Sequence, residues 1–230
     1  MLASPFRTLA LALTLVLVPA CSSTGSAFLV FGGSDAPQAD LVARVRASEK
    51  ELERSRTDFG QAFTLYQRLS APQAVELERL SKEFASAVKA CAGRAREHGK
   101  RVDAVREAKE ELMQGWSEEL AGYSSETMRK KSATMMQDTD TRAQKVLASL
   151  EGVQQRMQPV LLKLQDYELF FHHNLNARAI ATLEDTYRDF DAEFRALEKE
   201  FERARGEVTG FLATFAEKEA EAAPQPAKPK

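Results

Sequence analysis

The sequence predicts an all-α protein, an elongated antiparallel helical bundle or coiled coil of about four long helices. Only 11 Gly and 8 Pro occur in 230 residues, and three of those Pro fall within the last seven positions. The remainder is rich in Ala, Glu, Lys, Leu and Arg, which is the composition of long helices. Apolar residues also recur at three- and four-residue steps over four long segments, as packed helices require.

The first predicted helix begins near Pro37, since proline suits a first helical turn, and ends near Ser70. Its buried side follows two seams of seven-residue steps, the pattern of long helices that pack side by side. One seam is Val45, Leu52, Phe59 and Tyr66, and the other is Leu41, Ser48, Ser55, Ala62 and Leu69.

Pro72 opens the second predicted helix, which extends to about Ala121. Its main seam also follows seven-residue steps, and neighbouring apolar residues widen the buried face. The seam is Leu77, Phe84, Cys91, His98, Val105 and Leu112, and the flanking residues are Leu80, Val88, Ala95, Val102 and Trp116. Gly122 then ends this helix, and Ser125 and Glu126 supply a capping hydroxyl and an acid for the next one.

The third predicted helix runs from about Ser125 to His172. Polar Thr139 and Arg142 interrupt its apolar stripe, so we expect looser packing there. Pro159 removes one backbone donor and predicts a modest kink. The expected buried side is Met128, Met135, Val146, Leu150, Val153, Met157, Val160, Leu164, Tyr167 and Phe171.

The fourth predicted helix has the clearest pattern, with alternating steps of three and four residues. Its stripe is Ile180, Leu183, Tyr187, Phe190, Phe194, Leu197, Phe201, Ala204, Val208, Phe211 and Phe215. At 1.5 Å per residue the four helices would be roughly 50 to 75 Å long, and short connections make neighbours antiparallel. We assign residues 37–218 to the bundle and residues 219–230 to a disordered tail rich in Pro and Lys.

Residues 1–20 predict a bacterial lipoprotein signal peptide. Arg7 precedes a short apolar run that is closed by Ala20 and Cys21, and the run is too short to span a bilayer. In this interpretation Cys21 receives a diacylglyceryl thioether, cleavage follows Ala20, and the new amine is acylated by a fatty acid such as palmitate. An ordinary secretory signal with an incidental Cys21 is the alternative.

The residue after Cys21 bears on the location of the anchored protein. It is Ser22, whereas an aspartate there is typical of retention at the inner membrane. We therefore expect lipid anchoring in the outer membrane, facing the periplasm, and two or three acyl chains suffice for stable anchoring. Residues 21–36 form a tether, whose apolar patch at 28–31 either enters the membrane interface or caps the bundle.

The mature chain is close to neutral. Loss of the signal peptide removes only Arg7 from 32 basic residues, which leaves 31 against 34 acidic residues and a formal charge of −3. This balance argues against nucleic-acid binding. Two basic bands, at 94–101 and 129–131, are expected to be solvated helix faces, with contact to lipid headgroups or glycan phosphates as the alternative.

One polar cluster falls in a turn-like position between the third and fourth helices: His172, His173, Asn174 and Asn176. Paired imidazoles could ligate a metal, but adjacent histidines on a helix point about 100° apart and rarely share one ion. Asn176 suits an N-cap, and Asn174 tolerates left-handed backbone. We therefore predict a turn and cap without metal, and keep the four residues as a candidate partner contact.

Cys91 and His98 lie two turns apart on one seam, and we interpret both as core residues. Zinc needs three or four ligands, and no further Cys or His completes a set here. A rise of about 10.5 Å between the two residues forbids a thiol–imidazole pair. With Cys21 lipidated, Cys91 also has no intramolecular disulfide partner.

Three motifs in the second half of the chain carry a family resemblance: 119–125 with Glu-Leu and Tyr-Ser-Ser, 157–161 with Met-Gln-Pro-Val-Leu, and His173–Leu183. They resemble a bacterial lipoprotein family of unknown function, the domain-of-unknown-function family twenty-nine fifty-nine. The resemblance covers most of residues 38–215 and implies a lipoprotein location and a helical fold, while the tether departs from the family pattern. It implies no activity.

These observations predict a non-catalytic outer-membrane lipoprotein, a periplasmic scaffold or adaptor that binds an unknown envelope protein and no cofactor. A carrier that takes lipid or another apolar ligand between its helices is the alternative. An enzyme is the third class, and no catalytic motif in the sequence favours it. Lys230 ends the tail, so covalent attachment to peptidoglycan is a weaker hypothesis beside a simple solvated tail.

Overall fold

The computed structural model describes residues 35–71, 76–175 and 184–222. The predicted signal peptide, Cys21, the apolar patch at 28–31, Asn176 and Lys230 all lie outside these residues. The described residues form helices and contain no strand. The helices are α1 (Asp35–Leu69), α2 (Leu77–Leu120), α3 (Glu126–His173) and α5 (Glu184–Ala222). Helix α5 therefore includes the first residues of the predicted tail, and the all-α prediction is confirmed.

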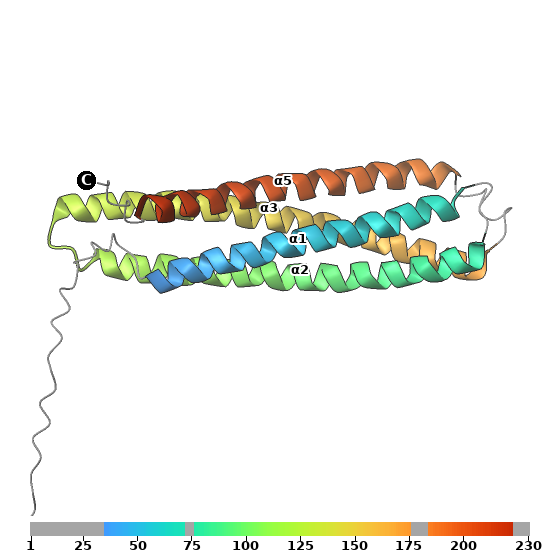
Figure 1. Ribbon diagram of the computed structural model, residues 1–230, viewed down its shortest axis with the longest axis horizontal. Helices are drawn as coiled ribbons and strands as arrows, with labels where there is room; N and C mark the ends of the chain where they lie inside the picture. The colour runs from blue at the N-terminus through green and yellow to red at the C-terminus, as the bar shows by residue number, and fades with distance from the viewer. Residues whose placement is uncertain (1–34, 72–75, 176–183, 223–230) are drawn as a thin grey trace, which may run out of the picture. The chain divides into compact units, whose positions relative to one another are not determined.

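The helices pack as an antiparallel bundle (Figure 1). Both α1 and α3 pack against α2 and against α5, so the four helices surround one core. Trp116 near the end of α2 contacts Ser132 near the start of α3. His98, earlier in α2, contacts Leu150, later in α3, so these two helices run in opposite directions. None of the described helices is both long and apolar enough to cross a membrane.

The predicted seams form most of the core. Both seams of α1 are buried at every predicted position, and in α2 only Leu77 is partly exposed. The α5 stripe is buried from Phe190 to Phe215, whereas Ile180 and Leu183 lie outside the described residues and the side chain of Tyr187 is not described. Helix α3 is continuous through Pro159.

The start of α3 corrects the sequence prediction. Met128 and Met135 are 42% and 38% exposed, and Ser132 and Thr139 are buried in their place. The reason is the seven-residue register: the buried seam of α3 is Ser132, Thr139, Val146, Val153 and Val160. Hydrophobicity favoured the two methionines, but they lie off this seam. Trp116 Nε1 donates a hydrogen bond to Ser132 Oγ at 2.9 Å, which gives the buried hydroxyl a partner.

Aromatic rings gather at one end of the bundle, where α1 and α3 end and α2 begins. Tyr66 is fully buried there and contacts several of the rings. Phe63 of α1 stacks on Phe194 of α5 with ring centroids 4.0 Å apart. We call this part the aromatic end, formed by Phe59, Phe63, Tyr66, Phe84, Tyr167, Phe171, Phe190, Phe194 and Phe201.

The opposite end holds the α2–α3 connection, and we call it the hairpin end. Gly122 N–H donates to the Glu119 carbonyl at 2.9 Å, which closes the last turn of α2. Ser125 then caps α3 by accepting a hydrogen bond from the Met128 N–H at 3.4 Å, as the sequence predicts. Its described buried rings are Trp116, Phe211 and Phe215, and the α3 seam contributes Ser132 and Thr139, so this end contains fewer buried rings than the aromatic end.

Candidate functional site

Cys91 and His98 lie inside the bundle, as predicted. The Cys91 thiol is fully buried, and burial raises its pKa to about 12. His98 is also fully buried, with Nε2 2.9 Å from the Leu150 carbonyl oxygen, and burial lowers the pKa of its imidazole. A neutral ring that donates from Nε2 fits these surroundings. Both residues are therefore part of the packed interior of the bundle.

In the predicted cluster at 172–176, Asn174 has a structural role, whereas His172 and His173 face solvent. Asn174 is the C-cap of α3, and its side-chain amide donates to the Phe170 carbonyl at 3.1 Å. Its φ of −130° is not left-handed, contrary to the sequence prediction. His172 and His173 are exposed on the last turn, with ring centroids 4.7 Å apart and nearly perpendicular. Within the described ranges no three potential metal ligands come together.

A second regular face of α3 points into solvent. Leu162 and Leu169 are each 61% exposed and lie one heptad apart. They belong to an exposed series with alternating steps of three and four residues, and the series contains no Asp, Glu, Lys or Arg. We call it the α3 strip: Gln155, Gln158, Leu162, Gln165, Leu169 and His172.

Helix α3 thus carries two seams on opposite sides. The inner seam, which includes Met157, Leu164 and Phe171, fills the core at the aromatic end. The outer seam is the α3 strip, which ends at one of the two histidines predicted as a partner contact. Leu162 and Leu169 were not predicted from the sequence because neither lies on the core stripe. A second three-and-four pattern in the same helix contains both.

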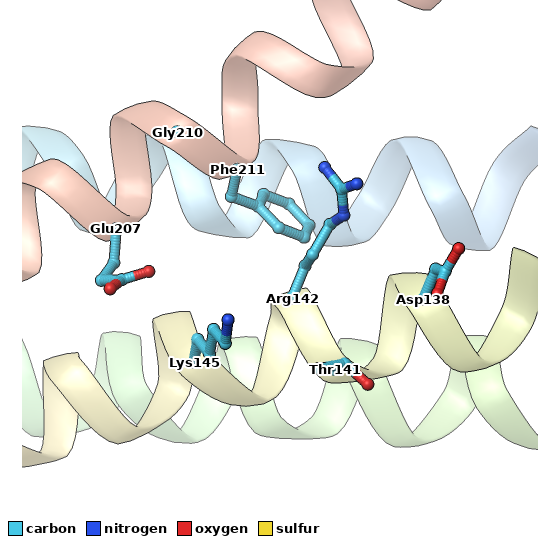
Figure 2. Close-up of a pocket in the computed structure, with 7 residues that line it drawn as sticks. All are labelled: Asp138, Thr141, Arg142, Lys145, Glu207, Gly210 and Phe211. Atoms are coloured by element: carbon cyan, nitrogen blue, oxygen red, sulfur yellow. The ribbon is translucent and has the colours of Figure 1, made fainter.

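A groove separates α3 from α5 near the hairpin end (Figure 2). Its volume is about 350 Å³. Figure 2 shows Phe211 of α5 and Arg142 of α3 projecting into the space between the two helices. Arg142 and Lys145 make no ion pair within the described part of the chain. The lining is Asp138, Thr141, Arg142, Lys145, Glu207, Gly210 and Phe211.

The predicted polar interruption of the α3 stripe at Thr139 and Arg142 is wrong. Thr139, Ala143 and Val146 continue the buried seam, and Arg142 is exposed beside it at the groove. The groove has two basic and two acidic side chains around one ring, so it favours no single charge.

The described residues define a class of protein: an all-α bundle with a filled aromatic end and a regular, uncharged outer face on one helix. Within that class, the chain belongs to the family described as protein of unknown function DUF2959, whose model matches residues 35–215. No significant match was found among curated proteins or among solved structures.

Proposed function

We propose that this protein is a non-catalytic lipoprotein of the bacterial envelope whose bundle is a periplasmic scaffold or adaptor for a protein partner. The observation that carries the proposal is the α3 strip. A helix face with regular three-and-four spacing and two exposed leucines suits packing against another helix. Isolated exposed apolar residues are common, but a repeat along one face is a feature of interaction surfaces.

The packing of the interior supports a scaffold over a carrier of apolar ligands. A carrier needs a concave, mostly apolar site that buries its ligand. At the aromatic end the space between helices is taken by rings, such as Phe63 stacked on Phe194 and Tyr66 against Phe190 at 5.0 Å. The groove beside Phe211 is lined by charged side chains on both helices.

The surroundings of the cysteine and histidine side chains support a non-catalytic role. A nucleophilic cysteine needs a lowered pKa and access to solvent, whereas the Cys91 thiol is buried with a pKa of about 12. His98 is held by the Leu150 carbonyl inside the bundle, where no substrate reaches it. His172 and His173 are accessible, but their arrangement is that of neighbours on one helix end.

The proposed location depends on the first residues of the chain. The apolar run that ends at Ala20-Cys21 is the basis for lipid attachment, and Ser22 is the basis for the outer membrane. Metabolic labelling with a palmitate analogue tests the anchor. Wild type and a Cys91→Ala control should be labelled and processed, whereas Cys21→Ser should accumulate as an unlabelled precursor. An unlabelled wild-type protein would contradict the anchor.

Site-specific photo-crosslinking in cells tests the scaffold. A photoreactive residue at Leu162 should give a protein adduct of defined mass. The same residue at Ala90, which is exposed on α2, is the matched control and should give none. Lipid adducts at Leu162 in place of protein adducts, or no adduct at all, would contradict a scaffold that acts through the α3 strip.

A further inference from the structure

We infer that the α3 strip packs against the α3 strip of a second copy of this chain, with the two helices parallel. The strip runs from Gln155 to His172 in steps of three, four, three, four and three residues. This is the a and d spacing of a two-stranded coiled coil, and it repeats outside the core seams. The inference rests on the proposed function, since the membrane anchor sets the direction of the two helices.

No other segment of the same chain is long enough to cover the strip from the aromatic end. Leu162 lies twelve residues before Asn174, about 18 Å along α3. The segment 176–183 joins α3 to α5, and its eight residues span at most about 28 Å. A path from the end of α3 to Leu162 and back needs about 36 Å, so this connection cannot reach Leu162 at the centre of the strip.

The two chain ends are also too far away. Helix α5 ends at Ala222, eleven residues beyond Phe211, and Phe211 lies beside Arg142 of α3. Arg142 is about 30 Å from Leu162, and the rest of α5 adds about 16 Å. Residues 223–230 span at most about 28 Å. The segment before Asp35 starts from the end of the bundle where α5 finishes (Figure 1), about 33 Å along the bundle from Leu162, whereas its apolar patch at 28–31 is at most about 25 Å of chain from Asp35.

The chemistry of the strip suits contact with itself. Leu162 and Leu169 would each meet their own counterpart and form two apolar layers. Gln158 and Gln165 form the layers between, and a glutamine amide both donates and accepts hydrogen bonds, so it pairs with a copy of itself. Since the strip contains no Asp, Glu, Lys or Arg, self-contact brings no like charges together along it.

The flanks of the strip fit a parallel pair. In parallel coiled coils, a side chain beside the seam pairs with the side chain five residues later on the partner helix. Glu168 and His173 have this spacing, so Glu168 of one copy would face His173 of the second copy. An antiparallel pair would instead place the two Asp35 residues, from which the anchored segments start, at opposite ends of the assembly, whereas two copies in one membrane favour them at the same end.

Disulfide trapping in membranes tests the inference on the full-length chain. Gln158→Cys should give a dimer under mild oxidation, because a parallel pair brings position 158 next to its counterpart. In an antiparallel pair centred on the strip, position 158 would face position 169 of the second copy, so the two copies of position 158 would lie about 16 Å apart along the helix. Cys91 is buried and does not compete. Ala90→Cys, exposed on α2, is the matched control.

We expect at least tenfold more dimer from Gln158→Cys than from Ala90→Cys, with both thiols equally reactive toward a maleimide. Adding Leu162→Glu and Leu169→Glu should abolish the product while helix content and thermal unfolding stay unchanged. Equal trapping at both positions, no trapping at 158, or trapping only between a Gln158→Cys copy and a Leu169→Cys copy would overturn the parallel contact. The labelling of Cys21 is a separate readout, so a failed anchor is distinguished from a failed contact.

Discussion

The two ends of the bundle are stabilised in different ways. At the aromatic end, rings from all four helices fill the space, and each ring buries on the order of 150–250 Å². At the hairpin end, the α3 seam contributes Ser132 and Thr139, and an open groove separates α3 from Phe211 of α5. One end therefore packs a cluster of nine rings, whereas the other combines fewer buried rings with a buried side-chain hydrogen bond, Trp116 to Ser132.

This difference bears on function, because the α3 strip lies on the outside of the aromatic end. The inner side of the same helix segment packs Met157, Leu164 and Phe171 into the core. A contact surface is better defined when its supporting side chains are fixed by packing. The end with more buried rings thus carries the face that we propose for the contact between copies.

The largest expected effect concerns two phenylalanines of α5, one at each end of the bundle. Phe194→Ala removes a ring stacked on Phe63 and should cost about 3–5 kcal/mol of unfolding free energy. Phe211 is also buried, but its ring lines the groove and packs on Phe215 with centroids 4.9 Å apart, so we expect Phe211→Ala to cost about 3 kcal/mol, at the lower end of this range. Chemical denaturation measures both. Equal losses would show that the two ends are packed alike.

The second prediction concerns the hydrogen bond inside the hairpin end. Ser132→Ala leaves the buried Trp116 N–H without its acceptor and should cost about 1–3 kcal/mol. In a Trp116→Phe background, which lacks that N–H, the same Ser132→Ala change should cost clearly less. A double-mutant cycle in urea measures the coupling. Additive losses would mean that the hydrogen bond contributes nothing to this end.

The third prediction uses His98, which lies between the two ends. Burial lowers the pKa of its imidazole in the folded state, so below the ordinary histidine pKa the unfolded chain binds a proton that the folded chain does not. Stability should therefore fall as pH drops below about 6.5, by up to about 1 kcal/mol at pH 5.5. The His98→Gln variant should not show this fall in stability at low pH. An identical pH profile for the two proteins would exclude a buried neutral His98.

The smallest expected effect is at the first turn of α3. Ser125→Ala removes the side-chain acceptor of the Met128 N–H and should cost about 0.5–1 kcal/mol, since the site is exposed. Ser124→Ala is the matched control and should be neutral. Thermal unfolding resolves the two variants. A larger loss at Ser124 would place the cap one residue earlier.

Most of the fold could be predicted because the seams of long helices obey simple periods. Seven-residue steps in α1 and three-and-four steps in α5 identified the buried residues directly. The start of α3 failed because Met128 and Met135 are more hydrophobic than Ser132 and Thr139, yet register decides which side faces the core. A serine is tolerated there through its bond to Trp116, a partner sixteen residues away that no local pattern reveals.

The candidate site was harder to predict, since exposure depends on which neighbours cover a helix. His172 and His173 were selected from the sequence as a candidate contact, and the structure leaves both exposed. Leu162 and Leu169 were missed, because a leucine in an amphipathic helix is expected to be buried.

The burial of Glu51 was also unexpected. Its side chain is 2% exposed inside α1, with Arg94 of α2 at 3.5 Å.

Native mass spectrometry of the mature protein, released from membranes in mild detergent, tests the central claim that this bundle acts through its surface. We expect a dimer in which each chain carries only the acyl groups of Cys21, and a monomer with the same acyl groups after Leu162→Glu and Leu169→Glu. A stoichiometric lipid or other apolar molecule retained by the wild-type chain and by this variant alike would contradict the account. That result would establish a carrier with an interior binding site.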